Sequence, residues 1–246
     1  MILETALADA LFLNWAIPLP ALPVLPGTLS YETRGQGGRA VGFFSLVLFR
    51  QIGLHARGAS WLALSYPQAN ARLQVRDAAG IPSTFLLRQL VPGWVVPIAR
   101  AVVRQPLSAG VLDFPRTGAE AADGRRWRLS AGKGLELTAR PGDPSAAEPA
   151  FADWPATVAF FRERRRAYWA RGNSLRRVES EPPSAEVVPM RVELLRTDWL
   201  DTFLSFAPAG GWSDLHSAFL VPEVRLAFVF GRERELAAPA PVAAAS

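Results

Sequence analysis

The sequence predicts a mainly β protein, built as an antiparallel sandwich or barrel with a few helices at its periphery. One observation predicts this class, and two others limit the kind of protein and its chemistry. Strand-like runs separated by glycine-containing turns recur along most of the chain. Half of the 246 residues are apolar and 20% are charged, which is typical of a globular protein. There is no cysteine, which excludes disulfides, thiolate metal sites and cysteine nucleophiles.

Two turns are the clearest hairpin signals. Gly35-Gln36-Gly37-Gly38 separates the predicted strands Thr28–Arg34 and Arg39–Arg50. Asp77-Ala78-Ala79-Gly80 separates Asn70–Arg76 from Ser83–Leu90. Further strands are expected at Leu107–Phe114, Arg125–Ser130, Leu135–Arg140, Val187–Arg196, Leu215–Val221 and Val224–Phe230.

Three helices are expected between these strands. Leu3–Leu13 is predicted to be a short helix, and Pro97–Arg104 begins with a proline suited to a first turn. A longer helix is predicted over Asp153–Arg171, with Asp153 as its N-cap and Gly172 at its end.

The chain is expected to form one domain over residues 1–235, followed by an alanine- and proline-rich disordered tail at 236–246. The proline-spaced stretch Pro18–Pro26 is interpreted as an extended structural arm. Met1–Trp15 lacks the positive charge that opens a signal peptide, and no apolar run is long enough for a membrane span. We therefore expect a cytoplasmic protein with no membrane partner.

The formal net charge of +5 comes almost entirely from arginine, because Lys133 is the sole lysine. The basic residues are scattered apart from Arg162, Arg164, Arg165 and Arg166, which we interpret as a solvated helix face. Trp127 between two arginines fits a strand with one buried face. Binding of nucleic acid or of an acidic partner is therefore the least favoured of the functions considered.

Motifs for common chemistries are absent. His55 and His216 are the two histidines, too few for a histidine zinc site, and no metal or cofactor is expected. The sequence contains no P-loop, no strand–GxGxxG–helix unit and no GxSxG elbow. Ser213-Asp214-Leu215-His216 is interpreted as a turn that leads into a strand, since the members of a catalytic triad usually converge from separate elements.

The strand Asn70–Arg76 carries the most informative pattern. Ala71, Leu73 and Val75 point to one face, and the polar Arg72, Gln74 and Arg76 point to the other. If the polar face lines the interior of a barrel, Arg72 is suited to bind a carboxylate, because a guanidinium can grip it through two hydrogen bonds. If it faces outwards, the strand is solvated on that side. The pattern alone favours neither.

Several stretches together resemble the uncharacterised YqjF-like branch of the acetoacetate decarboxylase-like superfamily. They include Phe12-Leu13-Asn14-Trp15, Leu25-Pro26-Gly27, and Asn70-x-Arg72-x-x-Val75 followed by Gly80 and Phe85. The resemblance continues in Pro97–Phe114, in Phe161-Arg162-Glu163-Arg164 with Tyr168, and in Phe219–Phe230, so that it spans residues 12 to 230.

The resemblance implies an antiparallel, cone-shaped β-barrel around a small cavity. In decarboxylating relatives a cavity lysine forms a Schiff base with a keto acid. The corresponding stretch here, Ala101–Pro106, contains no lysine, and Lys133 stands between two glycines at an expected hairpin tip. The Schiff-base mechanism is therefore not expected in this chain.

Two hypotheses follow. The favoured one is a barrel that binds a small anionic or carbonyl-containing molecule, with Arg72, Gln74, Arg50 and Gln105 as polar contacts in an otherwise apolar cavity. The alternative is a lysine-independent enzyme of the lyase or isomerase type, for which Glu32 and Asp113 are the candidate carboxylates. No catalytic residue is assigned, and the high apolar fraction fits either a well-filled barrel or a homo-oligomer.

Overall fold

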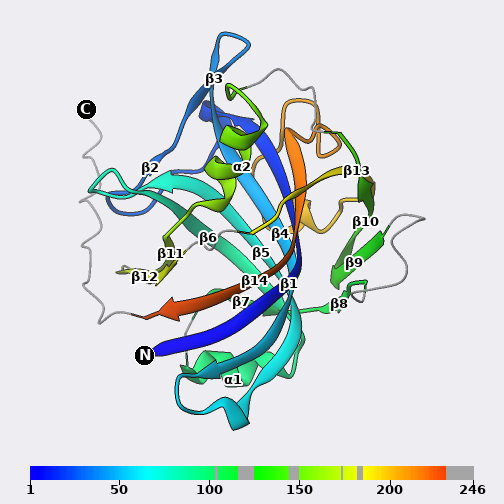
Figure 1. The fold of residues 1–246 in the computed structure, drawn as a ribbon. Helices are drawn as coiled ribbons and strands as arrows, with labels where there is room; N and C mark the ends of the chain where they lie inside the picture. The colour runs from blue at the N-terminus through cyan, green and yellow to red at the C-terminus, as the bar shows by residue number, and fades with distance from the viewer. Residues whose placement is uncertain (103–104, 116–124, 144–149, 173, 182–184, 231–246) are drawn as a thin grey trace.

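The computed structural model describes residues 1–102, 105–115, 125–143, 150–172, 174–181 and 185–230 (Figure 1). The predicted tail at 236–246 and residues 103–104 of the predicted helix Pro97–Arg104 lie outside this part of the chain. The described residues are mainly β, as expected, and their strand pairings form a large sheet and a smaller one that are joined through β13 and β14.

Seven strands pair in a closed ring. From β1 the pairings pass through β4, β5, β6, β11, β12 and β14, and β14 pairs with β1 again. All these pairings are antiparallel except β6–β11, which is parallel. The strands are β1 (Ile2–Pro18), β4 (Arg39–Ala56), β5 (Leu64–Arg76), β6 (Pro82–Val91), β11 (Arg166–Arg171), β12 (Ser174–Ser180) and β14 (Ser217–Val229).

A second sheet extends from β14 and covers part of the ring from outside. It consists of β13 (Val188–Arg196), β10 (Lys133–Pro141), β9 (Arg125–Ala131) and β8 (Val111–Asp113). The short strands β2 (Ser30–Tyr31), β3 (Arg34–Gln36) and β7 (Leu107–Ala109) add to the edges of β5, β4 and β6. Helices α1 (Val95–Val102) and α2 (Trp154–Arg162) lie near opposite ends of the ring (Figure 1).

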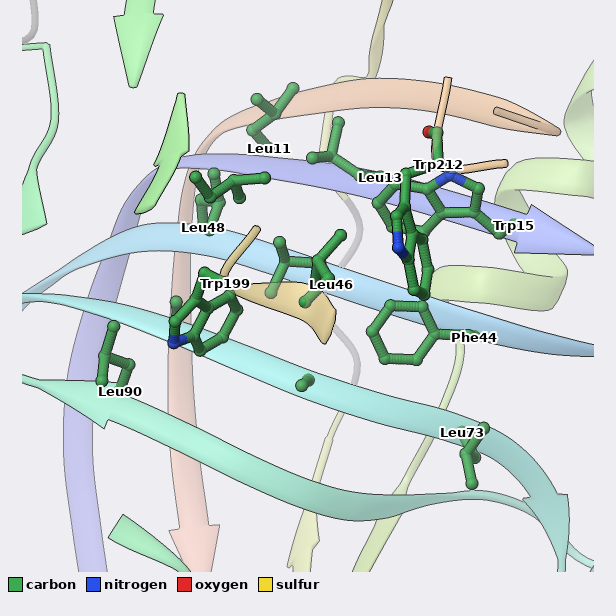
Figure 2. Close-up of a cluster of buried hydrophobic side chains, with 14 of the residues drawn as sticks. Leu11, Leu13, Trp15, Phe44, Leu46, Leu48, Leu73, Leu90, Trp199 and Trp212 are labelled. Atoms are coloured by element: carbon green, nitrogen blue, oxygen red, sulfur yellow. Dashed lines mark hydrogen bonds between the residues drawn. The ribbon is translucent and has the colours of Figure 1, made fainter. Parts of the chain in front are cut away.

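The largest apolar core lies between the outer face of the ring and the second sheet. Leu13 and Trp15 of β1, Phe44 and Leu46 of β4 and Leu73 of β5 point to the same side (Figure 2). The Trp15 indole Nε1 donates to the Trp212 carbonyl oxygen over 2.8 Å, which holds the loop before β14 against the ring. From the other side this core receives Trp127, Leu129, Leu135, Leu137 and Trp199. The outer face of the ring is therefore buried here.

The predicted helix over Leu3–Leu13 is wrong, because this segment is the larger part of β1. Asp9 has a φ of 51° and forms a bulge between the paired positions Ala8 and Leu11. A bulge adds one residue and shifts the inward and outward alternation of a strand. The apolar residues on either side of Asp9 therefore lose the period of two, and their spacing imitates a helix.

The separation of two predicted strands, Leu215–Val221 and Val224–Phe230, is likewise wrong, since β14 continues through Pro222. Val221 pairs with Ala10 and Glu223 pairs with Ala8, so Pro222 falls beside the bulge of β1. Proline cannot donate a hydrogen bond to a strand ladder and is tolerated where the ladder is interrupted. The two irregularities thus lie next to each other.

The predicted helix over Asp153–Arg171 is correct at its start and too long at its end. Asp153 caps α2 as expected, its carboxylate accepting from the Ala156 amide at 2.8 Å. The helix ends at Arg162, and the chain continues as β11, which fills the edge between β6 and β12. Ion pairing of Arg166 to Asp77, at 2.6 Å, fixes this strand in place. Pairing with the sheet therefore overrides the local helical pattern.

His216 is buried in an aromatic box formed by Phe43, Phe151 and Phe161, with ring centroids 5.5 to 6.0 Å away. Neither ring nitrogen has a hydrogen-bond partner among the described residues. Burial lowers the pKa of His216 from 6.5 to about 4. The histidine is therefore neutral in the folded protein at neutral pH.

This burial predicts an acid-sensitive contribution to stability. As the pH falls from 6.5 towards 4, His216 takes up a proton in the unfolded chain but not in the folded one. The free energy of unfolding therefore decreases by up to about 3 kcal/mol. His216→Phe should lack this part of the pH dependence while keeping an aromatic ring in the box. Chemical unfolding of both proteins between pH 4 and 7 measures it, and parallel profiles would show that His216 is not the source.

Candidate ligand-binding cavity

The ring of strands surrounds a cavity of about 380 Å³. All seven ring strands contribute to its wall, together with α1. The volume lies within the range of roughly 300–1,000 Å³ that is common for small-molecule sites. Exposed Met1, Leu62 and Ile98 belong to the lining, so the cavity reaches solvent at the end near α1.

Most of the wall is apolar. The apolar residues lie on the inner face of the ring. In β1 and β4 a bulge changes which positions point inwards. On β1 the inward positions change from Leu7 to Ala10 across Asp9, and on β4 they change from Gln51 to Leu54 across Gly53, whose φ is 62°. Other apolar wall residues are Leu3, Phe12, Val47, Phe49, Leu64, Leu86, Val221, Val224, Leu226 and Phe228.

A row of polar side chains crosses this wall on β5. Tyr66, Gln68, Asn70 and Arg72 alternate along the strand and all line the cavity. Gln68 Nε2 donates to Asn70 Oδ1 over 2.7 Å, and burial raises the pKa of Tyr66 to about 12, which keeps its phenol protonated. Neighbouring positions add Gln51, Thr84, Gln89 and Gln105. The polar face of β5 is thus the inner one, while Ala71, Leu73 and Val75 pack in the outer core.

Arg72 lies where β5 meets the end of α2. Its Nη2 donates to the carbonyl oxygen of Phe161, at the last turn of α2, over 3.0 Å, and its guanidinium lies 5.1 Å from the Phe12 ring centroid. Its Nε has no hydrogen-bond partner among the described residues. Burial, and secondly the charge of Arg164, lower the pKa of Arg72 to about 9, so it remains a cation at neutral pH.

Arg162 and Arg164 bring two more guanidinium groups to the same end of the cavity. Arg162 Nη1 donates to the Ala185 carbonyl oxygen over 2.7 Å, and its ion pair with Glu163 is long, at 3.8 Å. Arg164 is buried and pairs directly with the carboxylate of Glu32. The Nε of each arginine has no hydrogen-bond partner among the described residues.

Glu32 pairs with a cluster of three arginines behind the cavity wall. It is 3% exposed, and besides Arg164 it contacts Arg76 Nη2 at 2.6 Å and Arg34 Nη2 at 3.6 Å. Because Glu32 is shared among three arginines and does not line the cavity, it does not balance the charge of Arg72. Within the described part of the chain, the cavity wall has three arginines but no aspartate, glutamate or lysine.

The predicted site residues fall into two groups. Arg72 and Gln105 line the cavity, whereas Gln74 and Arg50 are not in its wall. Gln74 lies on the inner face of β5 but is fully buried, and its Nε2 donates to Ser45 Oγ at 2.9 Å. Arg50, on β4, is half-buried, and the candidate carboxylate Asp113 is exposed on β8.

The interpretation of Arg162 and Arg164 as part of a solvated helix face is wrong. Arg162 ends α2, and Arg164 lies two residues later with its side chain only 3% exposed. Gln68 and Asn70, which line the cavity beside Arg72, are not among the predicted site residues. Their alternation in Gln68-x-Asn70-x-Arg72 is the signal that would have added them to the predicted polar face. Nothing in the sequence around residue 162 indicates that the helix ends there.

Lys133 is exposed and opens β10, directly after Gly132 of the β9–β10 hairpin, as expected. It is not part of the cavity wall. The described residues contain no cluster of three or more histidine, cysteine, aspartate or glutamate side chains that could hold a metal ion. Among the helices in the same ranges, none is long and apolar enough to cross a membrane.

Solved structures share this fold at low sequence identity. The enduracididine biosynthesis enzyme MppR complexed with pyruvate matches with a TM-score of 0.60 and 16% identity, over 96% of this chain and 91% of that one. An acetoacetate decarboxylase-like enzyme from Sphingomonas wittichii RW1 matches with a TM-score of 0.57 and 14% identity, over 96% and 93% of the two chains. The fold is therefore that of acetoacetate decarboxylase-like proteins.

A search of curated proteins finds no match. The model of one protein family, in contrast, matches residues 4–209, a range that contains both helices and every strand from β2 to β13. The chain belongs to this family, DUF2071, described as "Uncharacterized conserved protein (COG2071)".

Proposed function

We propose that this protein binds a small anionic molecule, or a carbonyl compound that carries an anionic group, inside the ring of strands, and that it does so without a Schiff base. Arg72 is the principal contact, and Gln105 and the polar row of β5 are secondary ones. We also propose that the chain belongs to the YqjF-like branch of the acetoacetate decarboxylase-like superfamily, because its motifs around Arg72 and Phe161 resemble those of that branch.

One observation carries the proposal. Arg72 is a cation on the wall of a mainly apolar cavity, and it has no carboxylate partner among the described residues. A buried charge without a partner is costly, and an anion that enters the cavity would relieve that cost. The carbonyl oxygen of Phe161 satisfies only one of the donors of the guanidinium.

The fold relatives are consistent with this proposal. In one of the solved MppR structures that enzyme is complexed with pyruvate, a small keto acid. At 16% identity the likeness concerns the fold, so the assignment of a ligand to this chain rests on its own arginines.

The enzyme alternative has less support. Glu32 is committed to three arginines, and Asp113 is exposed on the second sheet. Tyr66 and His55 line the cavity. His55 Nε2 lies 3.5 Å from Glu4, but this carboxylate also pairs with Arg57 and is not in the cavity wall, which has no carboxylate among the described residues. We therefore propose a binding role.

The absence of Schiff-base chemistry can be tested directly. The protein is incubated with pyruvate or acetoacetate, reduced with borohydride and weighed intact by mass spectrometry. We expect no adduct on Lys133, because this side chain is exposed, outside the cavity and not desolvated as a reactive amine must be. Lys133→Arg separates this residue from the terminal amine. An adduct that vanishes in this variant would contradict the proposal.

The role of Arg72 predicts a difference between two variants that lose the same charge. Arg72→Gln should weaken the binding of octanoate, measured by calorimetry, by about tenfold or more, because the anion loses its cation in a desolvated site. Arg50→Gln should leave the affinity within about twofold, since Arg50 is not in the cavity wall.

Thermal unfolding of both variants checks that they are folded, because Arg72→Gln also loses the hydrogen bond to Phe161. If the two substitutions weaken binding equally, the effect comes from the net charge of the protein, and Arg72 is not the contact.

A further inference from the structure

We infer that the ligand is an amphiphilic monocarboxylate, whose carboxylate lies at the α2 end of the cavity and whose unbranched apolar tail extends towards α1. This inference rests on the proposed function and adds the class and the orientation of the ligand. It follows from how charge and apolar surface are distributed along the cavity.

The two ends of the cavity differ in chemistry. The α2 end holds Arg72, Arg162 and Arg164, which gather around the last turn of this helix. The α1 end is lined by the apolar Leu62, Leu64 and Ile98, together with the uncharged polar side chains of Tyr66 and Gln105. The two helices lie near opposite ends of the ring (Figure 1). A ligand that satisfies both ends must be charged at one end and apolar at the other.

The charge at the α2 end calls for one anionic group. Arg164 pairs with Glu32, which Arg34 and Arg76 share, and Arg162 has Glu163 within 3.8 Å. Arg72 has no ion-pair partner among the described residues and is left with a single hydrogen bond to a neutral carbonyl. One carboxylate therefore supplies the ion-pair partner that Arg72 lacks among the described residues.

The size and the walls of the cavity call for a tail. Leu7, Phe49, Leu226 and Phe228 form an apolar part of the wall, apart from the polar row of β5. A ligand as small as pyruvate would occupy only part of about 380 Å³ and would leave this apolar wall without contacts. An alkyl or aryl tail that fills the space gains apolar burial with each carbon.

Calorimetry at constant pH and ionic strength tests this inference with the full-length protein. The probes are acetate, butanoate, hexanoate, octanoate and decanoate, with pyruvate, acetoacetate and the uncharged decanol for comparison. We expect the affinity to increase about threefold to fourfold per methylene, because each one leaves water for an apolar wall. Decanol should bind at least about tenfold more weakly than decanoate, since it lacks the group that pairs with Arg72.

A matched pair of variants on β14 locates the tail. Leu226→Ser makes the cavity wall polar, while Arg225→Ser changes the neighbouring exposed position on the outer face of the same strand. Leu226→Ser should reduce the affinity for decanoate about tenfold and that for acetate about twofold or less, whereas Arg225→Ser should change neither by more than about twofold.

The outcomes separate this inference from the proposed function. If the acids of all lengths bind equally well, or if Leu226→Ser weakens acetate and decanoate alike, the inferred tail is wrong while the proposed anion site stands. If decanol binds as tightly as decanoate, the carboxylate assignment at Arg72 is wrong. If no acid binds, pyruvate and acetoacetate included, the proposed function fails as well.

Discussion

The closure of one sheet on itself, with both of its faces buried, is the constraint on which the rest of the structure depends. The outer face of β1, β4 and β5 packs against the second sheet, and their inner face surrounds the cavity. Apolar residues are therefore required on both sides of β1 and β4. Polar side chains appear inside where they serve the cavity, as along β5, or where they bond to one another, as Asn14, Ser45 and Gln74 do. The inner wall can carry the charge of Arg72, which has no ion-pair partner in the described part of the chain, because the outer core provides much of the apolar burial.

The sequence predicts the parts of the fold that local chemistry specifies. The turn at Asp77–Gly80 joins strands as expected, and the turn predicted at Gly35–Gly38 is confined to Gly37 and Gly38, because glycine at positive φ fixes the hairpin geometry in each. The strand predicted over Thr28–Arg34 is wrong, since this stretch holds the short β2, which pairs with β5, and only the first residue of β3. The helix predicted over Leu3–Leu13 fails because a bulge that depends on the partner strand shifts the alternation of β1. The end of α2 is missed for a similar reason. The helix stops at Arg162 because the following residues pair with β6, a strand distant in the sequence.

The same distinction explains how much of the candidate site could be predicted. Arg72 is identified because its strand alternates, although the sequence cannot tell which face is the inner one. Gln74 shares that face, yet its bond to Ser45 removes it from the cavity wall, and nothing local to Gln74 indicates this. Arg162 and Arg164 are misplaced because their positions follow from the end of α2. Arg72 in turn contacts the last turn of α2, so the residue that is proposed to hold the ligand also holds part of the structure that shapes its site.

The ring is not equally strong around its circumference. β1 pairs with β4 and with β14 over most of its length, whereas β12 and β14 pair at only two positions, Glu179 with Val229 and Ser180 with Phe228. Strands held by few hydrogen bonds separate at a lower free energy than those held by long ladders. This short seam borders the cavity through Ser180 and Phe228. The seam is therefore the part of the ring that opens at the lowest free energy, while the long ladders on the other side keep the fold intact.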